Sequence, residues 1–173
     1  MTSISPYTLW LMGPTSSGKS TIAGEFVSAL RERDVCVLHY DGDEIRGMFG
    51  KNLSFDEPDR GKVVETLSHL ANKANGAGVN VVVSALTAHQ SARDFVEKNI
   101  PNLLVASVEC PISVCVDRDP KGLYEKARRG EINTLIGYNS EYIPPASPAI
   151  ILDANNCSVE ENIQHLFALL GVQ

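Results

Sequence analysis

The sequence predicts an α/β protein with three layers, in which a parallel five-stranded sheet carries helices on both faces. Two observations support this prediction. Short apolar runs with the length of buried strands alternate along the chain with longer stretches whose apolar residues recur at helical spacing. Since parallel strands need long crossover connections, this alternation favours a parallel sheet with both faces covered. The length of 173 residues is typical of one domain, so we expect a single domain over residues 1–173.

Five runs of residues fit buried strands. The first run ends at Gly13 and the second ends at Asp41-Gly42, because glycine and aspartate commonly close a strand. The third run is the most strand-like, since it contains four β-branched residues. The predicted strands span residues 7–12, 35–40, 79–86, 103–109 and 149–152.

The stretches between these strands predict helices. Ser158 and Glu161 have the spacing of a capping box at the start of the last helix. Ser91 is the expected N-cap of another helix, and Pro111 suits the opening of a further one. The predicted helices span residues 20–31, 59–77, 91–99, a segment that starts at residue 111, and 158–170.

One long segment breaks the alternation of strands and helices. Residues 120–148 are rich in charged residues, glycine and proline, and they show no strand pattern. A connection of this length inside a compact domain is usually functional. We therefore predict a mobile lid at about residues 120–142, which would close over a binding site.

The first predicted strand leads directly into a phosphate-binding motif. Residues 13–20 read GPTSSGKS and match GxxxxGK[ST] without deviation, with a strand before them and a helix after them. Backbone N–H groups of such a loop surround the phosphates of a nucleoside triphosphate, and the positive end of the following helix faces them. The motif predicts the P-loop NTPase fold. Lys19 should reach the β- and γ-phosphates, and the Ser20 hydroxyl should bind Mg²⁺. The predicted phosphate-loop residues are Gly13, Pro14, Thr15, Ser16, Ser17, Gly18, Lys19, Ser20 and Thr21.

Carboxylates follow the second predicted strand, where residues 41–44 read DGDE. The carboxyl ends of strands in an α/β sheet face the ligand crevice, so these side chains should lie near the phosphates. A carboxylate there can accept the proton of an attacking hydroxyl or hold Mg²⁺. Asp41 is the first candidate for this role and for the second Mg²⁺ ligand, and Asp43 is the second candidate base. A simple turn is the alternative interpretation of this segment. Together with Lys19, the two aspartates form the predicted catalytic set.

Other classes of P-loop protein fit the sequence less well. The strand around residues 79–83 ends in Ser84-Ala85-Leu86, so no acid stands where a GTPase or motor ATPase usually places its magnesium-linked aspartate. No NKxD-type guanine-reading motif is found. The net charge of -6 argues against broad binding of nucleic acid or anionic membranes. The four cysteines form no CxxC pair, and the N-terminus has no signal-peptide pattern. We therefore expect a cytoplasmic protein with free thiols and with neither nucleic-acid nor membrane partners.

Several further motifs resemble the adenylylsulfate kinase family. The DGD string is followed by Arg46, and Phe55 stands shortly before Asp59-Arg60. Residues 118–128 read RDPKGLYEKAR, where the family reads close to RDxKGLYxKAR. The similarity continues over residues 130–145 and so covers nearly the whole chain. The RDxKGLY string is far more specific than the phosphate loop.

The resemblance implies a kinase that uses ATP and Mg²⁺ to phosphorylate the ribose 3′-hydroxyl of adenylylsulfate. It implies that Arg46 and Arg60 hold the phosphosulfate and nucleotide of the acceptor. It further implies that Phe55 stacks on the acceptor base and that Arg118 packs over the ATP adenine. The partner is then a small-molecule nucleotide, and the protein is expected to be a homodimer, as is common in the family. The acceptor-binding residues predicted on this basis are Arg46, Phe55, Arg60, Leu86, Lys121 and Leu135.

The sequence departs from the family pattern on the acceptor side. Glu44 stands where the family has Asn, Val63 lies in a segment that has lost the family's polar residues, and Leu135 replaces a stacking Phe. A related group, the cytidine diphosphoramidate kinases of capsule modification, is similar in reading DGDE-[LI]-R, which Glu44 and Ile45 fit. This group is the alternative for the acceptor. A nucleotide-binding switch module without acceptor chemistry and a kinase for another small molecule or a nucleic-acid end are the alternatives of other classes.

Overall fold

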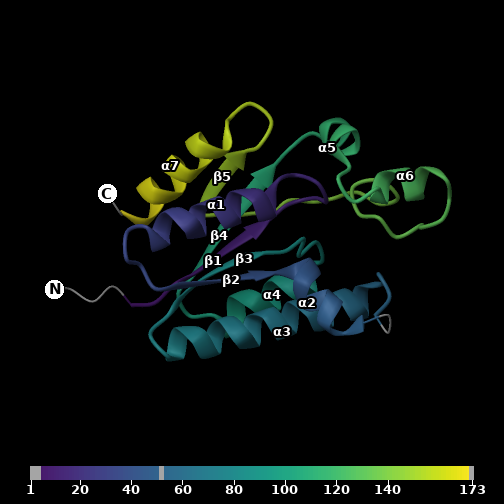
Figure 1. The fold of residues 1–173 in the computed structure, drawn as a ribbon. Coiled ribbons are helices and arrows are strands. Elements are labelled where there is room, and N and C mark those ends of the chain that lie inside the picture. Colours follow the sequence, from purple (N-terminus) through teal and green to yellow (C-terminus); the bar gives the residue numbers. More distant parts are fainter. Residues whose placement is uncertain (1–4, 51–52, 172–173) are drawn as a thin grey trace.

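A single parallel sheet forms the centre of the protein, whose computed structural model describes residues 5–50 and 53–171. The strands run in the order β2-β3-β1-β4-β5, and every neighbouring pair is parallel (Figure 1). This order and the helices on both faces confirm the predicted fold class. The strands are β1 (Thr8–Met12), β2 (Val37–Asp41), β3 (Asn80–Ser84), β4 (Leu103–Glu109) and β5 (Ile150–Asp153).

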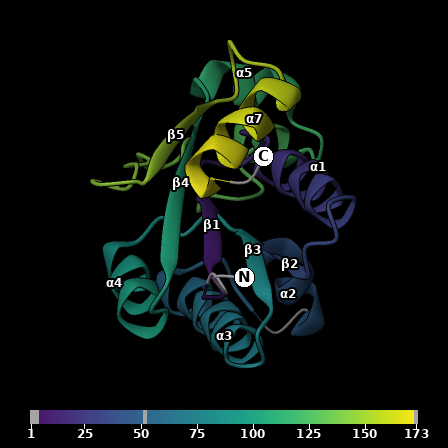
Figure 2. The ribbon, with the colours of Figure 1, turned by 90° about the vertical axis from the view of Figure 1, so that its left-hand side faces the viewer.

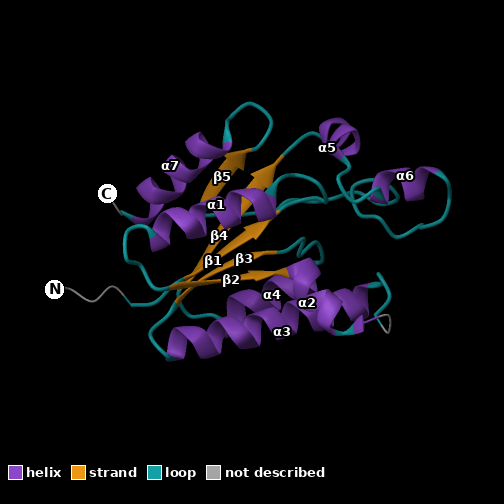
Figure 3. Ribbon diagram, viewed as in Figure 1, coloured by secondary structure: helices purple, strands orange, loops and turns teal. Residues whose placement is uncertain are grey.

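Helices cover the sheet in two layers (Figure 3). One layer contains α1 (Lys19–Arg31) and α7 (Val159–Leu170). The other layer contains α2 (Gly42–Met48), α3 (Glu57–Gly76) and α4 (Gln90–Asn99). The remaining two helices, α5 (Ile112–Arg118) and α6 (Leu123–Arg128), lie beyond the carboxyl ends of the strands (Figure 1). Within the described ranges, none of the helices combines the length and the apolar character that crossing a bilayer requires.

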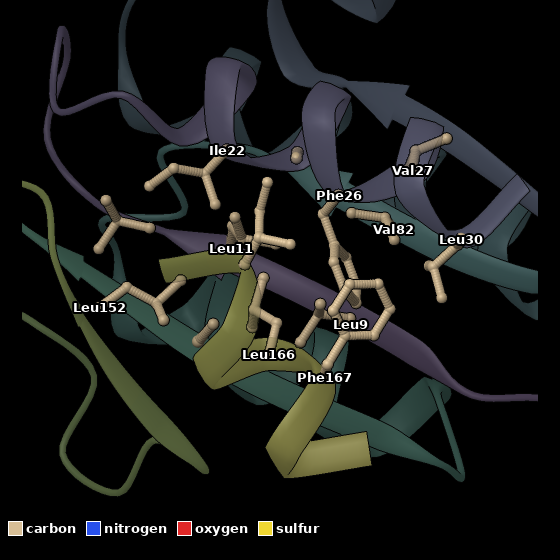
Figure 4. Packing of buried hydrophobic residues seen from close by; sticks show 14 of the residues in the cluster. Leu9, Leu11, Ile22, Phe26, Val27, Leu30, Val82, Leu152, Leu166 and Phe167 are labelled. Carbon is tan, nitrogen blue, oxygen red and sulfur yellow. The ribbon is translucent and has the colours of Figure 1, made fainter. Parts of the chain in front are cut away.

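The central strand β1 sends its side chains alternately into the two halves of the core. Leu9 and Leu11 pack toward α1 and α7, where Figure 4 shows them beside Phe26 and Phe167. Trp10 packs on the opposite side of the sheet, among residues of α3 and α4. All five residues of β1 are buried and four of them are apolar, as expected of a strand that is covered on both faces. When the molecule is turned, the two helical layers are seen on opposite sides of the sheet (Figure 2).

Phe26 is the largest fully buried side chain in the half of the core that α1 and α7 cover. It is fully buried on α1, and its ring meets that of Phe167 edge to face with centroids 5.1 Å apart. We expect Phe26→Ala to lower the free energy of unfolding by about 3–5 kcal/mol, measured by urea denaturation, because a large cavity would remain. The partly exposed Phe95 gives a matched control, and Phe95→Ala should cost less than half as much. Equal losses in the two variants would contradict this account of the core.

Two predicted helix starts need correction. Ser91 is not the N-cap of α4, because that helix begins at Gln90 and His89 occupies the N-cap position without a side-chain hydrogen bond. The Ser91 hydroxyl instead donates to Glu57 Oε1 over 3.0 Å, a contact that ties α4 to the start of α3. Helix α3 itself begins at Glu57, two residues before the expected start, with a proline in its first turn.

Two helices were not predicted, and one predicted cap is confirmed. The sequence analysis predicts no helix over residues 42–48, but the structure has α2 there. Helix α6 lies within residues 120–148, for which no regular element was predicted. At the start of α7, by contrast, Ser158 and Glu161 form the expected capping box, with both reciprocal hydrogen bonds present.

Candidate active site

The loop between β1 and α1 has the backbone shape that the phosphate-binding motif requires. At Gly13, an added Cβ would lie 2.5 Å from the carbonyl oxygen of Val108, so no larger residue fits there. Ser16 and Gly18 have φ angles of 64° and 99°, which turn the backbone back toward the start of α1. Such successive turns direct backbone N–H groups into one concave surface suited to anions.

Lys19 lies at the start of α1 with its side chain folded back over this loop. Its Nζ donates to the carbonyl oxygen of Pro14 over 2.6 Å. Burial lowers the pKa of Lys19 to about 8, and the nearby carboxylate of Asp43 opposes this shift in part. A phosphate chain placed in the loop would supply the anionic partner that the buried ammonium group needs.

Asp41 ends β2 and is held by four hydrogen bonds. The hydroxyls of Ser20 and Ser84 each donate to its Oδ2 over 2.6 Å. The backbone N–H groups of Asp43 and Glu44 donate to Oδ1 over 2.9 and 3.4 Å, so Asp41 also caps α2. Burial raises the pKa of Asp41, but these hydrogen bonds outweigh burial and the net pKa lies below the usual value.

The hydrogen bonds around Asp41 also fix the tautomer of His39. The Ser84 hydroxyl has one proton and donates it to Asp41, so it can only accept from His39 Nε2, which lies 2.9 Å away. His39 therefore carries a proton on Nε2. Burial lowers the pKa of His39, which favours the neutral imidazole. His39 thus donates to Ser84, and Ser84 donates to the ionised carboxylate of Asp41.

Asp43 differs from Asp41 in that most of its side chain is exposed to solvent. It stands in the first turn of α2, and its side chain is 65% exposed. Its Oδ2 forms an ion pair with Lys121 Nζ, from the segment predicted as a lid. Asp43 lines the cavity described below, whereas Asp41 does not.

A cavity of about 620 Å³ joins the phosphate loop, the ends of β2 and β3, and residues of the 120–148 segment. A volume of this size suits a nucleotide-sized ligand. Most of the predicted site residues meet here, but Gly13, Pro14 and Asp41 do not line the cavity. The predicted residues that do line it are Thr15, Ser16, Ser17, Gly18, Lys19, Ser20, Thr21, Asp43, Arg46, Phe55, Arg60, Leu86, Arg118, Lys121 and Leu135.

One end of the cavity carries an exposed aromatic ring between two cations. The Phe55 side chain is 43% exposed, and the guanidinium carbons of Arg46 and Arg60 lie 4.6 and 5.5 Å from its ring centroid. Arg46 donates to the carbonyl oxygen of Ser54 over 2.7 Å, and Arg60 donates to that of Thr134 over 2.9 Å. Burial and the neighbouring Arg46 lower the pKa of Arg60 to about 10. Two guanidinium groups beside a ring suit a ligand with both a base and acidic oxygens.

The opposite end of the cavity lies between Arg118 and the start of α7. Arg118 Nη2 donates to the carbonyl oxygen of Ala154 over 2.7 Å, which ties the end of α5 to the segment that follows β5. An added Cβ at Gly18 would lie 3.9 Å from Arg118 Nη1, so the guanidinium lies beside the phosphate loop. Cys157 and Val159 also line the cavity and add apolar surface at this end.

Some residues of the site were missed by sequence reasoning. From the sequence, Ser84 is notable only because it stands where many P-loop proteins have a magnesium-linked aspartate. In the structure its hydroxyl donates to Asp41. Its position opposite Asp41 follows from the register of β2 and β3, which the sequence does not state. Tyr124 connects the 120–148 segment to the phosphate loop, since its hydroxyl donates to the carbonyl oxygen of Thr15 over 2.9 Å. Tyr124 stands inside the KGLY string, which was the available signal. Leu135 is 5% exposed and packs against Tyr124 as well as lining the cavity.

Comparisons with known proteins agree with this geometry. The sequence profile of the family described as adenylylsulphate kinase matches residues 5–153. An adenylyl-sulfate kinase of Oceanobacillus iheyensis is 34% identical over 164 residues, which cover 94% of this chain and 82% of the relative. One from Rippkaea orientalis is 36% identical over 163 residues, with 94% and 90% covered.

The fold comparison gives the same family. The structure of the Mycobacterium tuberculosis APS kinase CysC, solved in complex with AMPPNP and APS, superimposes with a TM-score of 0.90 at 32% identity. The match covers 96% of this chain and 98% of that one. The profile match and the overall similarity agree with the phosphate loop, the DGD string and the RDxKGLY string. This chain therefore belongs to the adenylylsulfate kinase family.

Proposed function

We propose that this protein is an adenylylsulfate kinase, which transfers the γ-phosphoryl group of ATP to the ribose 3′-hydroxyl of adenylylsulfate. One observation carries the proposal: a phosphate loop, a carboxylate and an arginine-flanked aromatic ring line the same cavity. The loop suits the donor, the ring and arginines suit the acceptor, and Asp43 lies on α2 between them. The names of the relatives in several bacteria support the same reaction.

Two oxygen donors, one at the start of α1 and one at the end of β2, fit a bound Mg²⁺ ion. The oxygen atoms Ser20 Oγ and Asp41 Oδ2 lie 2.6 Å apart beside the phosphate loop. Hard oxygen donors, few in number and completed by phosphate oxygens, are the ligands that Mg²⁺ prefers in kinases. We propose that Ser20 and Asp41 hold Mg²⁺ with ATP, directly or through water. When bound, the ion would neutralise charge on the transferring phosphoryl group.

The geometry favours Asp43 over Asp41 as the catalytic base. All the hydrogen bonds that Asp41 accepts stabilise its ionised form and lower its basicity, whereas Asp43 presents a carboxylate to the cavity. In the proposed step, the 3′-hydroxyl oxygen attacks the γ-phosphorus while its proton passes to Asp43. The bond from the γ-phosphorus to the β–γ bridging oxygen breaks, and ADP leaves. Lys121, which pairs with Asp43 in this structure, would turn to the oxygens of the bound phosphoryl or sulfuryl groups.

A transfer assay with purified protein and Mg²⁺-ATP tests this proposal. Adenylylsulfate and cytidine diphosphoramidate are offered separately, and phosphorylated product is measured for each acceptor. We expect efficient turnover with adenylylsulfate. Turnover with the cytidine compound alone would show that Glu44 and Leu135 mark a different acceptor pocket. Hydrolysis of ATP without phosphorylation of either acceptor would overturn the proposal.

Arg60 should contribute mainly to binding of the acceptor. Its guanidinium lines the end of the cavity where the Phe55 ring lies. We expect Arg60→Ala to raise KM for adenylylsulfate about 10- to 100-fold, because a charge-assisted hydrogen bond is lost. The KM for ATP should change less than threefold. Arg129 is exposed and does not line the cavity, so Arg129→Ala is the matched control and should change neither constant.

The assembly and the compartment are also proposals. We propose a homodimer in the cytoplasm, since the family is commonly dimeric and all four cysteines are free. Light scattering after size-exclusion chromatography should give twice the chain mass of 18.7 kDa.

A further inference from the structure

Arg93 on α4 is a buried cation that is bound by backbone oxygens alone. The residue is 4% exposed, and no carboxylate among the residues that the structure describes forms an ion pair with it. Its Nε donates to the carbonyl oxygen of Thr87 over 2.9 Å. Its Nη1 and Nη2 donate to the carbonyl oxygens of Pro144 and Ile143 over 3.2 and 2.5 Å. Burying a cation without an anionic partner is unfavourable for folding, so stability alone does not account for a guanidinium here.

Thr87, the first of these partners, has a strained backbone at the wall of the cavity. Its φ angle of 43° lies in the left-handed region, which β-branched residues rarely adopt. Thr87 is buried, and Trp10 Nε1 donates to its hydroxyl over 2.9 Å. Because Arg93 binds the Thr87 carbonyl oxygen, side chains from two separate elements hold the strained conformation. Leu86 and Thr87 follow β3, and both line the cavity.

The other two carbonyl oxygens lie at the end of the lid segment, residues 120–142. Ile143 is followed by two prolines, and both proline and the residue before it have restricted backbone angles. Arg93 therefore fixes a stiff stretch of chain to α4. Thr134 of the lid segment lines the cavity, and Arg60 donates to its carbonyl oxygen. The guanidinium of Arg93 thus joins the wall of the cavity to the end of the segment that covers it.

We propose that Arg93 is a positioning residue for the acceptor, which acts by holding the lid segment against the cavity wall at Thr87. Arg93 does not line the cavity itself, so it would act through the backbone that it binds. Without its planar fork, the closed arrangement would be populated only about a tenth of the time, and the apparent affinity for the acceptor would fall by the same factor. Saturating acceptor would restore the closed arrangement. The inference rests on the proposed function, whose acceptor it concerns.

Steady-state kinetics of Arg93→Met test this proposal, because methionine fills much of the same space without the cation. We expect KM for adenylylsulfate to rise about tenfold while kcat stays within about threefold of wild type. KM for ATP should change less than about twofold, since no carbonyl that Arg93 binds belongs to the phosphate loop. Arg93→Lys restores the charge without the fork, so its KM for adenylylsulfate should lie between the two. Lys98 is an exposed cation of the same helix, and Lys98→Met should change neither constant.

Phe26→Ala separates a loss of positioning from a loss of stability. Phe26 lies on α1 in the other half of the core, so this variant should unfold more easily and keep the wild-type KM for adenylylsulfate. An unchanged KM for adenylylsulfate in Arg93→Met would overturn the inference. An equal rise of both KM values in that variant would overturn it as well.

Hydrogen exchange gives a second measurement that needs no turnover. The backbone N–H groups of Tyr138 and Asn139 donate to the carbonyl oxygen of Leu135 within the lid segment. In Arg93→Met these amides should exchange at least about tenfold faster, while the amides of β1 exchange as in wild type. Unchanged exchange in the lid segment, or an equal increase in β1, would contradict the role given to Arg93. The predicted exchange difference in a protein that does not phosphorylate adenylylsulfate would sink the proposed function alone.

Discussion

Lys19→Ala is expected to remove at least about 99% of the phosphoryl transfer activity. The ammonium group of Lys19 is folded over the phosphate loop and is desolvated there, with its pKa lowered to about 8. A preorganised cation of this kind acts where charge develops on the transferring group, and removing one such donor typically costs about 10²–10³-fold in turnover. The bond to the Pro14 carbonyl shows that the side chain already points along the loop before any phosphate arrives.

Turnover with Mg²⁺-ATP and adenylylsulfate measures the effect of this change. Lys126 is a suitable control, since it is an exposed lysine of α6 that does not line the cavity, and Lys126→Ala should keep wild-type turnover. Circular dichroism should show that Lys19→Ala remains folded, because the lost side chain makes one hydrogen bond to the protein. Retention of more than a tenth of wild-type turnover would contradict the role given to Lys19.

The parts of the fold that the sequence predicts are those with local causes. The phosphate loop, the capping box of Ser158 and the buried strands all depend on residues that are near one another in the chain. Helix α2 was missed because it is short, begins with glycine and has its cap, Asp41, in a string that also fits a turn. Ser91 was mistaken for an N-cap because its residue type fits that role, while its actual partner, Glu57, is 34 residues away.

The candidate site shows the same division between local and distant contacts. The sequence indicates that Lys19, Ser20 and Asp41 belong to one site, since motif and strand order place them there. It does not show that Ser20 and Ser84, from two separate elements, converge on a single oxygen of Asp41. That contact depends on the register of β2 and β3 and decides how basic Asp41 can be. The choice between two neighbouring aspartates therefore needs the structure.

Asp43→Asn is expected to lower turnover about 10²–10⁴-fold while leaving the affinity for Mg²⁺-ATP within about threefold of wild type. Asparagine keeps the size of the side chain and cannot accept the proton of the attacking hydroxyl. The Asp43 side chain is not needed to cap α2, because the cap is Asp41. The fold should consequently tolerate the change, which thermal unfolding can verify.

The variant Asp41→Asn distinguishes a catalytic base from a residue that holds Mg²⁺ and caps α2. The amide group of asparagine would have to face four donors with one oxygen, so Asp41→Asn should unfold more easily and need more Mg²⁺ for half-maximal turnover. At saturating Mg²⁺ it should recover more activity than Asp43→Asn does. The opposite pattern, with an active Asp43→Asn and an Asp41→Asn that no concentration of Mg²⁺ restores, would assign the base to Asp41. The two variants differ by one carboxylate each, so the ratio of their turnover numbers at saturating Mg²⁺ decides which carboxylate takes the proton.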